Sequence, residues 1–487
     1  MWMASEEIPF QVYTLFGIQQ ATAPVAWAVQ GHVLPLRSGL TIPAGLSVRF
    51  TLPARPRPGR LLAVFGASAT NVKSARLRIH FRPRRRWQDL LACRPASILL
   101  LDEKVAPFDA TQPWQEKEVA LDSANKAGDQ GEICVECSAP AGHGLVLYEL
   151  VLATADKLSL CRARAHNAWR TKNELAHFST VYAHPLYQVK QDAPSATPQP
   201  TPKENAHDLA ARLYREQLLA LGYAARPMDL ALRLQARLTA AAQSKGALPL
   251  NVMSLCSGAA RIERGLFGPH QEKVAITLFD LNEQLLGMAA RHFAGLASVQ
   301  LTAGDVNRLR LPPRTYDIVV CVSALHHVVE LEHVLAEVAG SLKPNGEFWL
   351  FGEYVGRNGA RLWDESYAVA NAWFKNLPER LRLNHTHYAA PRVDLNLPNF
   401  DCSLSTFEAI RSEEIEPILH RSFQPLDCCR DNCFLWRLFE LAYMSNFDTA
   451  SSEDRDLIIQ AVQADVQHLV RGTLRANALD GVFAVKT

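Results

Sequence analysis

From residue 250 to residue 354, short apolar segments alternate regularly with stretches of helical periodicity. The apolar segments are LNVMSL, VAITLFD, VQLTAGD, YDIVVCVSAL and GEFWLFGEY, which begin at residues 250, 274, 299, 316 and 346. Between the last two, Leu331, Val334, Leu335, Val338 and Leu342 follow the i, i+3, i+4 spacing of one helix face. Apolar strands separated by amphipathic helices form a parallel, doubly wound α/β sheet. The alternation therefore predicts the fold class of the C-terminal half.

The N-terminal half has a different pattern, typical of antiparallel β structure. Segments 47–52, 60–67, 75–81, 132–137 and 144–154 are rich in β-branched and aromatic residues. Leu77, Ile79 and Phe81 alternate with polar residues, as a strand with one buried face requires. We expect a separate all-β sandwich or jelly-roll domain over residues 1–190.

Residues 191–206, with the sequence QDAPSATPQPTPKENA, separate the two halves. Prolines interspersed with serine, threonine and glutamine cannot pack a core, so this segment is predicted to be a semi-rigid, solvated linker. The α/β domain is then placed at residues 207–487.

Composition and charge exclude several classes of function. The net charge of +2 argues against general nucleic-acid binding, which needs a concentrated basic face. No uninterrupted apolar run reaches the roughly 18 residues of a membrane span, and the first residues do not resemble a signal peptide. Ten scattered cysteines indicate reduced thiols. We therefore expect a cytoplasmic protein. A homodimer is a separate, open possibility.

The ends of the predicted strands carry residues suited to binding a nucleoside. In a doubly wound sheet, ligands bind outside the carboxyl ends of the strands. The first strand ends in a small-residue turn, CSGAAR, and the second and third end in Asp280 and Asp305. The first carboxylate can accept from both hydroxyls of a ribose, and the second from an exocyclic amine. Either aspartate alone could be a helix cap, but two at successive strand ends favour a nucleoside site.

These motifs resemble those of the class I S-adenosylmethionine-dependent methyltransferases. VMSLCSGAARIE is similar to the first motif of that family, ITLFDLNEQLL to its ribose-binding segment and LTAGDVNRL to its adenine-contacting segment. The stretch from residue 316 to residue 353, containing LHHV and LKPNG, resembles the fourth and fifth motifs. The resemblance implies a seven-stranded sheet, closed by DGVFAVKT at 480–487 as its last, antiparallel strand, and S-adenosylmethionine as cofactor. It implies these cofactor-binding residues: Ser254, Cys256, Ser257, Gly258, Asp280, Leu281, Asp305, Val306 and Ser323.

The first motif departs from the family pattern, commonly L-D-x-G-x-G-x-G. Ser254 replaces the usual acid, Cys256 the first glycine and Ala260 the last, so that Gly258 alone is retained. Ser254 loses a carboxylate that usually helps to order the amino-acid end of the cofactor. We expect ordinary dihedrals at Ala260 and a need for positive φ at Gly258 alone. Weakened or lost cofactor binding stays an open alternative.

Candidate catalytic residues follow the fourth and fifth strands. His326 or His327 could remove a proton from an acceptor hydroxyl, since imidazole is available as a base near pH 7. Alternatively, one histidine packs against the sheet and the other caps the next helix. Glu353 is a further catalytic candidate, either as a base or by orienting a sugar hydroxyl.

Residues 356–425 are longer than a plain connection and are predicted to be an insertion that covers the substrate. The candidate substrate-binding residues are Tyr354, Arg357, Arg361, Trp363, Tyr367, His385, His387 and Tyr388. The histidines of this insertion and the earlier pair have no evident carboxylate partner in the sequence, so we expect no metal site.

The sequence therefore predicts a methyltransferase acting on a hydroxyl of a sugar, glycan or other polar metabolite. One alternative is O- or N-methylation of a natural product or peptide. Another is a non-catalytic binding or assembly protein with a degenerate methyltransferase fold. A nicotinamide enzyme is disfavoured because the first motif lacks G-x-G-x-x-G.

Overall fold

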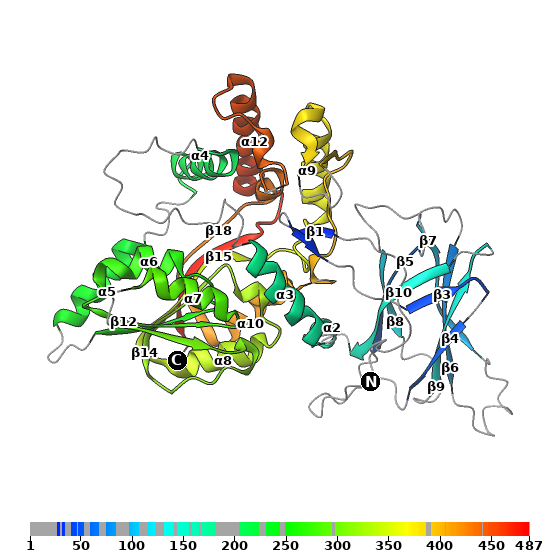
Figure 1. The fold of residues 1–487 in the computed structure, drawn as a ribbon, viewed down its shortest axis with the longest axis horizontal. Helices are drawn as coiled ribbons and strands as arrows, with labels where there is room; N and C mark the ends of the chain where they lie inside the picture. Colours follow the sequence, from blue (N-terminus) through cyan, green and yellow to red (C-terminus); the bar gives the residue numbers. More distant parts are fainter. Residues whose placement is uncertain are drawn as a thin grey trace. The chain divides into compact units, whose positions relative to one another are not determined.

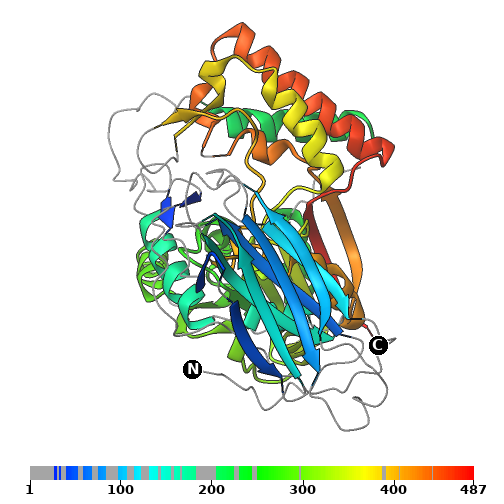
Figure 2. The ribbon, with the colours of Figure 1, turned by 90° about the vertical axis from the view of Figure 1, so that its right-hand side faces the viewer.

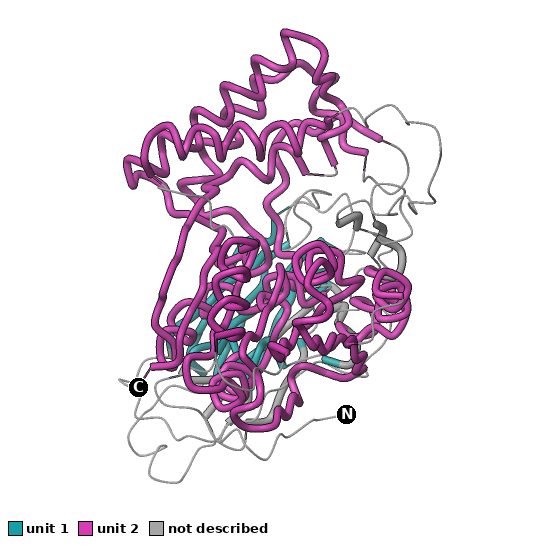
Figure 3. Tube along the Cα trace, turned by 90° about the vertical axis from the view of Figure 1, so that its left-hand side faces the viewer, with its two compact units in different colours: residues 1–26, 35–169 teal, residues 27–34, 170–487 magenta. Residues whose placement is uncertain are grey.

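The computed structural model describes residues 27–29, 32–34, 40–45, 47–52, 59–67, 75–83, 97–106, 115–121, 131–140, 144–154, 158–164, 167–181, 204–223, 230–243, 249–294, 298–385, 391–404, 406–440 and 442–486. The chain forms two compact units, shown in different colours in Figure 3. Unit 1 comprises residues 1–26 and 35–169, and unit 2 comprises residues 27–34 and 170–487. The predicted linker lies outside the described residues up to residue 203, and the predicted boundary at 190 stays a prediction.

Unit 1 contains two four-stranded antiparallel sheets, whose strands are blue to cyan in Figure 2. The first has the order β3 (Leu40–Pro43), β10 (Gly144–Thr154), β5 (Gly59–Ala67) and β8 (Gln115–Leu121). The second has the order β4 (Ser47–Leu52), β9 (Gly131–Ser138), β6 (Ala75–Pro83) and β7 (Ile98–Val105). Helix α2 (Leu158–Arg164) follows β10.

The two sheets of unit 1 contribute side chains to one hydrophobic cluster. Phe65 and Leu147 come from the first sheet, and Ile79 and Val135 from the second. The alternation predicted around Ile79 is confirmed, because alternate side chains of β6 are buried and its two central arginines are exposed. Antiparallel β structure is thus present, while the sandwich or jelly-roll architecture stays a prediction.

Unit 2 is built on a seven-stranded sheet. Its order is β13 (Val299–Ala303), β12 (Val274–Asp280), β11 (Leu250–Leu255), β14 (Tyr316–Val322), β15 (Leu342–Tyr354), β19 (Ala478–Val485) and β18 (Phe423–Asp431). The first five strands are parallel, and β19 is antiparallel to both of its neighbours. The chain enters at β11, moves outward to β13 and then crosses to β14. This confirms the predicted doubly wound sheet and places its switch point between β11 and β14.

Helices cover both faces of this sheet, as Figure 1 shows. Helices α5 (Leu230–Gln243), α6 (Arg261–Phe267) and α7 (Glu283–His292) share a hydrophobic cluster with one face. Helices α8 (Leu331–Ser341) and α10 (Ser412–Ser422) pack on the other. Successive side chains of a strand pack on opposite faces of the sheet. Val252 belongs to the first cluster and Met253 to the second. The strands are apolar on both faces for this reason.

Two details of the sheet differ from the prediction. The C-terminal strand β19 lies between β15 and β18, so that β18 and not β19 forms the edge. The sequence of β18 did not indicate a strand, because among its side chains Phe423 alone is buried. The LKPNG motif lies at the start of β15, where Asn345 takes a positive φ of 65°.

A separate layer of helices forms beyond the sheet. Helices α4 (Ala206–Ala220), α9 (Asp364–Lys375), α11 (Leu435–Leu438) and α12 (Ser452–Arg471) share one hydrophobic cluster (Figures 1 and 2). The predicted insertion at 356–425 is only part of this layer. Helices from before and after the insertion complete its core, since Leu209 and Ile458 share one cluster with Phe374 of the insertion.

The remaining elements of unit 2 are short, apart from one helix. The strand pairs are β1 (Trp27–Val29) with β2 (His32–Leu34) and β16 (Leu383–Asn384) with β17 (Arg392–Val393). The 3-10 helices are η1 (Gly268–His270), η2 (Val306–Arg308), η3 (Leu325–His327), η4 (Glu379–Arg382), η5 (Cys402–Leu404) and η6 (Met444–Asn446). Helix α3 (Asn167–Val181) belongs to unit 2 from residue 170 onward. Within the described ranges, no helix is both long enough and apolar enough to cross a bilayer.

Candidate functional site

A cavity of about 1120 Å³ opens at the carboxyl ends of the parallel strands. Its wall includes the turns that follow β11, β12, β13, β14 and β15, which is where the topology predicts a ligand. Residues of α3, α4, the 407–408 segment and the 431–436 segment complete the wall. The cavity therefore combines the predicted motifs with segments that are distant in sequence.

The turn after β11 keeps a glycine-like backbone although two of its residues are not glycine. Cys256, Gly258 and Ala260 have φ angles of 52°, 52° and 51°. The expectation that Gly258 alone needs positive φ is therefore wrong. A left-handed residue at every second position bends the chain sharply from β11 into α6, and this geometry is kept at the steric cost of two Cβ atoms.

Asp280, at the end of β12, ties this turn to the next strand. Its Oδ2 accepts a hydrogen bond from the Gly258 N–H at 2.8 Å, and its Oδ1 accepts from the Asn282 N–H at 2.7 Å. Burial raises the pKa of Asp280, although both N–H donors oppose that shift. The carboxylate also lines the cavity, so it both shapes the turn and faces the ligand space.

The carboxylate that Ser254 lacks is supplied by the following helix. Ser254 is fully buried, and its Oγ donates to Oε1 of Glu263 in the first turn of α6 at 2.7 Å. Glu263 lines the cavity, whereas Ser254 does not. Burial raises the pKa of Glu263, and the Ser254 hydroxyl partly opposes this.

Two buried polar atoms on the cavity wall suit a polar ligand. The Ser257 Oγ and the Asn282 Nδ2 are buried and find no hydrogen-bond partner among the described residues. Buried polar groups are normally hydrogen-bonded, so such atoms beside a cavity indicate groups that a ligand completes. They flank the ends of β11 and β12, where the resemblance places S-adenosylmethionine, and the residues present fit that cofactor.

The other predicted cofactor residues lie where the motifs place them. Leu281, Val306 and Ser323 line the cavity, as do Cys256 and Asp305. Oδ1 of Asp305 accepts from the Asn307 N–H and from Asn307 Nδ2, both at 2.9 Å, so this aspartate also caps η2. Among the described residues of the predicted cofactor set, Ser254 is the only one that does not line the cavity.

Glu353 and His326 form a buried pair at the ends of β15 and β14. The Glu353 carboxylate is fully buried and accepts from the backbone N–H groups of Leu325 and His326 at 2.9 and 2.8 Å. Its Oε1 also lies 2.8 Å from Nδ1 of His326. Glu353 does not line the cavity, whereas His326 does. Glu353 is therefore placed to position His326 and not to touch a ligand.

His327 joins a second set of carboxylates. Its Nδ1 lies 2.5 Å from Oε1 of Glu174, on α3, and its Nε2 lies 3.5 Å from Oε2 of Glu408. Burial lowers the pKa of His327, but Glu174, Glu408 and Glu353 outweigh burial and raise that pKa to about 9. The pKa of Glu174 is lowered, because His327 outweighs burial.

Hydrogen bonds to neighbouring elements fix the position of Glu408. The N–H of Phe407 donates to Oε2 of Glu174 at 3.0 Å, and the N–H of Ile410 donates to the carbonyl of His326 at 3.0 Å. Arg170 of α3 donates to the carbonyl of Ser403 in the same segment. Glu408 is thus held between α3 and η3.

The predicted substrate-binding residues are mostly engaged elsewhere. Tyr354 lines the cavity, but Arg357 pairs with Asp364 and the Trp363 ring lies under the Arg475 guanidinium. Arg361 donates to the carbonyl of Asn358, Tyr367 packs on the helical-layer cluster, and His385 pairs with Asn446. His387 and Tyr388 lie outside the described residues. The insertion packs most of these polar side chains on its own helices, which local sequence does not reveal.

Several wall residues were missed from the sequence, namely Glu174, Glu263, Glu408 and Asp431. Glu263 was visible in the first motif as an acid one helical turn past the glycine. The others carry no local signal, since each comes from a segment that only the tertiary fold brings to the cavity.

Comparison with known proteins agrees with the motifs. Residues 257–350 match the family model of a methyltransferase domain. No curated protein matches the chain.

Similar solved structures include three with low sequence identity. The CurJ carbon methyltransferase has 16% identity and a TM-score of 0.23 over 26% of this chain. The YcgJ protein from Bacillus subtilis has 16% identity and a TM-score of 0.28, over 52% of this chain and 97% of that one. An S-adenosylmethionine-dependent methyltransferase from Mesorhizobium loti has 15% identity and a TM-score of 0.27, over 50% and 95%. The chain spans only 35% of the length of the CurJ protein.

Replacing Ala260 with glycine is expected to stabilise the protein by about 1 kcal/mol, because glycine avoids the Cβ strain of a left-handed residue. Thermal unfolding of the full chain measures the effect. Ala259→Gly is the matched control, since Ala259 is equally buried but not left-handed, and it should not stabilise. An equal effect of both changes would contradict the strain at Ala260.

The stability of unit 2 should depend on pH through Asp431. Burial, followed by the charges of Asp480 and Asp465, raises the pKa of Asp431 from 3.8 to about 7. The unfolded chain then releases this proton first as pH rises. The contribution of Asp431 to the free energy of unfolding therefore decreases as the pH rises from about 4 to about 7, and it stays constant above about pH 7.

Asp431→Asn removes this dependence, so its stability gain over wild type should grow between pH 4.5 and pH 8 to about 2–3 kcal/mol. Denaturant unfolding at several pH values measures the gain. Asp427→Asn, at an exposed position of the same strand, is the control and should show no such trend. A gain for Asp431→Asn that does not change with pH would refute the assignment.

Proposed function

The chain carries a class I S-adenosylmethionine-dependent methyltransferase domain, and on this premise we propose that it methylates a hydroxyl group of a sugar, glycan or other polar metabolite. The single observation that supports an oxygen acceptor is the His326–Glu353 pair beside the cavity. A hydroxyl must lose its proton during methyl transfer, and a histidine oriented by a buried carboxylate is suited to assist that loss.

The cofactor would be held by the ends of β11, β12 and β13. Asp280, Asp305 and Glu263 all line the cavity. Asp280 would accept from the ribose hydroxyls and Asp305 from the adenine amine, while Glu263 would pair with the ammonium of the amino-acid end. When bound, S-adenosylmethionine supplies a methyl group already activated by its sulfonium. The protein's task is then to orient the acceptor and exclude water.

A polar acceptor is supported by the part of the cavity wall that lies outside the cofactor motifs. His207 and Arg215 of α4 lie on it, together with Asp431 and Asn432 from the end of β18. A wall with charges of both signs and a side-chain amide suits a ligand with several hydrogen-bonding groups better than an apolar one. Tyr354, with burial raising its pKa, stays a neutral phenol whose O–H donates to the Arg361 carbonyl at 2.7 Å, which leaves its oxygen to accept from such a ligand.

Asp280→Asn should weaken S-adenosylmethionine binding about tenfold to a hundredfold, because the neutral amide is a poorer acceptor for two ribose hydroxyls. Calorimetric titration of the full chain gives the dissociation constant. Asp317→Asn, at the opposite end of the sheet where β14 begins, is the control and should leave it unchanged. Unaltered affinity in Asp280→Asn would remove the ribose assignment, and no cofactor binding by folded wild type would favour the assembly-protein alternative.

His326→Gln should lower the rate of methyl transfer at least a hundredfold while changing the dissociation constant for S-adenosylmethionine less than threefold. Transfer of isotopically labelled methyl to a panel of polyhydroxylated acceptors measures the rate. His270→Gln, outside the cavity, is the control. Full activity of His326→Gln, or label appearing only on nitrogen or carbon acceptors, would overturn the hydroxyl assignment.

A further inference from the structure

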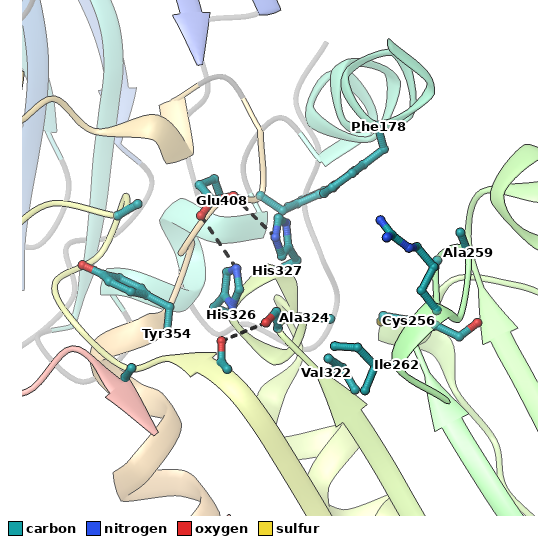
Figure 4. Close-up of a pocket in the computed structure, with 18 of the residues that line it drawn as sticks. Phe178, Cys256, Ala259, Ile262, Val322, Ala324, His326, His327, Tyr354 and Glu408 are labelled. Atoms are coloured by element: carbon teal, nitrogen blue, oxygen red, sulfur yellow. Dashed lines mark hydrogen bonds and ion pairs between the residues drawn. The ribbon is translucent and has the colours of Figure 1, made fainter. Parts of the chain in front are cut away.

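His326, His327 and Glu408 converge on one point at the cavity wall. One ligand atom from each residue lies within 4.8 Å of those of the other two. In Figure 4 the two imidazoles lie side by side below Glu408, and a dashed line joins each ring to that carboxylate. The rings come from η3, after β14, whereas Glu408 comes from a segment some eighty residues further along the chain.

Outer carboxylates fix which nitrogen of each ring faces Glu408. Nδ1 of His326 lies 2.8 Å from Glu353, and Nδ1 of His327 lies 2.5 Å from Glu174. A carboxylate only accepts, so the Nδ1 of each ring keeps its proton, and the Nε2 atoms facing Glu408 are the nitrogens that would lose theirs to a bound metal. Carboxylates that hold the distal nitrogen in this way are characteristic of histidines that ligate a metal.

The distances from the rings to Glu408 fit shared ligands better than hydrogen bonds. Nε2 of His326 lies 3.7 Å from Oε1 of Glu408, and Nε2 of His327 lies 3.5 Å from Oε2. A charge-assisted N–H···O bond is about 2.7–2.9 Å long. Two ligands each about 2.1 Å from one tetrahedral cation lie about 3.4 Å apart. The two observed separations, each to a different oxygen of Glu408, are close to this edge length.

The charge around this point requires a positive partner. Glu174, Glu353 and Glu408 are all within or against the cluster, and the side-chain exposure of these three is 16% or less. Buried carboxylates are stable only when positive charge or donors compensate them. Backbone N–H groups donate hydrogen bonds to Glu353, and one backbone N–H donates to Glu174. The Glu408 carboxylate instead faces the Nε2 atoms of the two histidines. One protonated imidazole, His327, still leaves the three carboxylates in excess, and a cation among the two histidines and Glu408 would balance that charge.

We propose that His326, His327 and Glu408 bind a divalent transition-metal cation, with Zn²⁺ the first candidate, while Glu353 and Glu174 orient the two imidazoles. Two histidines and one carboxylate with positions left open toward a cavity are a donor set for Zn²⁺ or Fe²⁺. The expectation from sequence of no metal site rested on a missing carboxylate, which the fold supplies as Glu408.

This inference rests on the proposed function for its role and deepens it. The cation would face the space in which the acceptor hydroxyl is proposed to lie, and a bound divalent cation lowers the pKa of a hydroxyl that contacts it. The histidines then act through the cation, so His326→Gln would remove a ligand as well as the oriented ring.

Zinc binding to the full chain tests the site. Protein stripped with a chelator and titrated with Zn²⁺ should bind a single equivalent, and Co²⁺ in its place should give the visible absorption of a tetrahedral site. Glu408→Gln, which keeps size and removes charge, should weaken Zn²⁺ binding at least tenfold, and Glu353→Gln should weaken it about tenfold to a hundredfold. Glu413→Gln, an exposed glutamate five residues further on, is the matched control and should bind as wild type does.

Circular dichroism of each variant, and the Co²⁺ spectrum of wild type, separate loss of the site from loss of the fold. Wild type that binds neither Zn²⁺, Fe²⁺ nor Co²⁺, or Glu408→Gln that is folded and binds as tightly as wild type, overturns the inference. If metal-free protein methylates a hydroxyl at the full rate, the role of the cation in the reaction is overturned and the proposed function stands. If Zn²⁺ binds at these residues and no hydroxyl is methylated, the proposed function fails and the site stands.

Discussion

The arrangement of the cavity depends on how the fold satisfies one buried charge, the carboxylate of Glu353. It lies at the end of β15 with no exposed surface, and the backbone N–H groups of η3 and the ring of His326 surround it. A buried carboxylate without hydrogen-bond donors would cost several kcal/mol, which is comparable to the net folding free energy of a whole domain. The chain leaving β14 is therefore drawn across the end of β15. His326 and His327 are held at the cavity wall as a consequence.

The turn after β11 shows how a departure from the family pattern is tolerated. Three left-handed residues keep the bend that glycines usually make, and Asp280 holds the turn through the Gly258 N–H. Ser254 and Glu263 together place a hydroxyl and a carboxyl group where the family has one acid at the strand end. In this chain the acid lies on the helix instead of the strand, and the hydrogen bond shows that the first turn of α6 reaches the end of β11.

The rest of the cavity wall comes from segments outside the methyltransferase motifs. Helix α3 brings Glu174 to the histidines, and the 407–410 segment brings Glu408, each fixed by hydrogen bonds to the other or to η3. The helical layer of α4, α9, α11 and α12 provides a further, polar part of the wall. These additions are where acceptor specificity would reside if the turns of the sheet hold the cofactor as proposed. The region before residue 190 thus contributes to the cavity, through α3.

The sequence by itself determined the sheet of unit 2 and the half of the cavity that is proposed to bind the cofactor. Strand and helix periodicity is local, and a parallel sheet brings the ends of successive strands to one edge, so Asp280, Asp305 and His326 could be placed without coordinates. The tertiary structure alone decided the left-handed backbone at Cys256 and Ala260, the position of β19 inside the sheet and the meeting of Glu408 with the histidines. Those features depend on contacts between residues far apart in the chain, and no periodicity or spacing along the sequence records them.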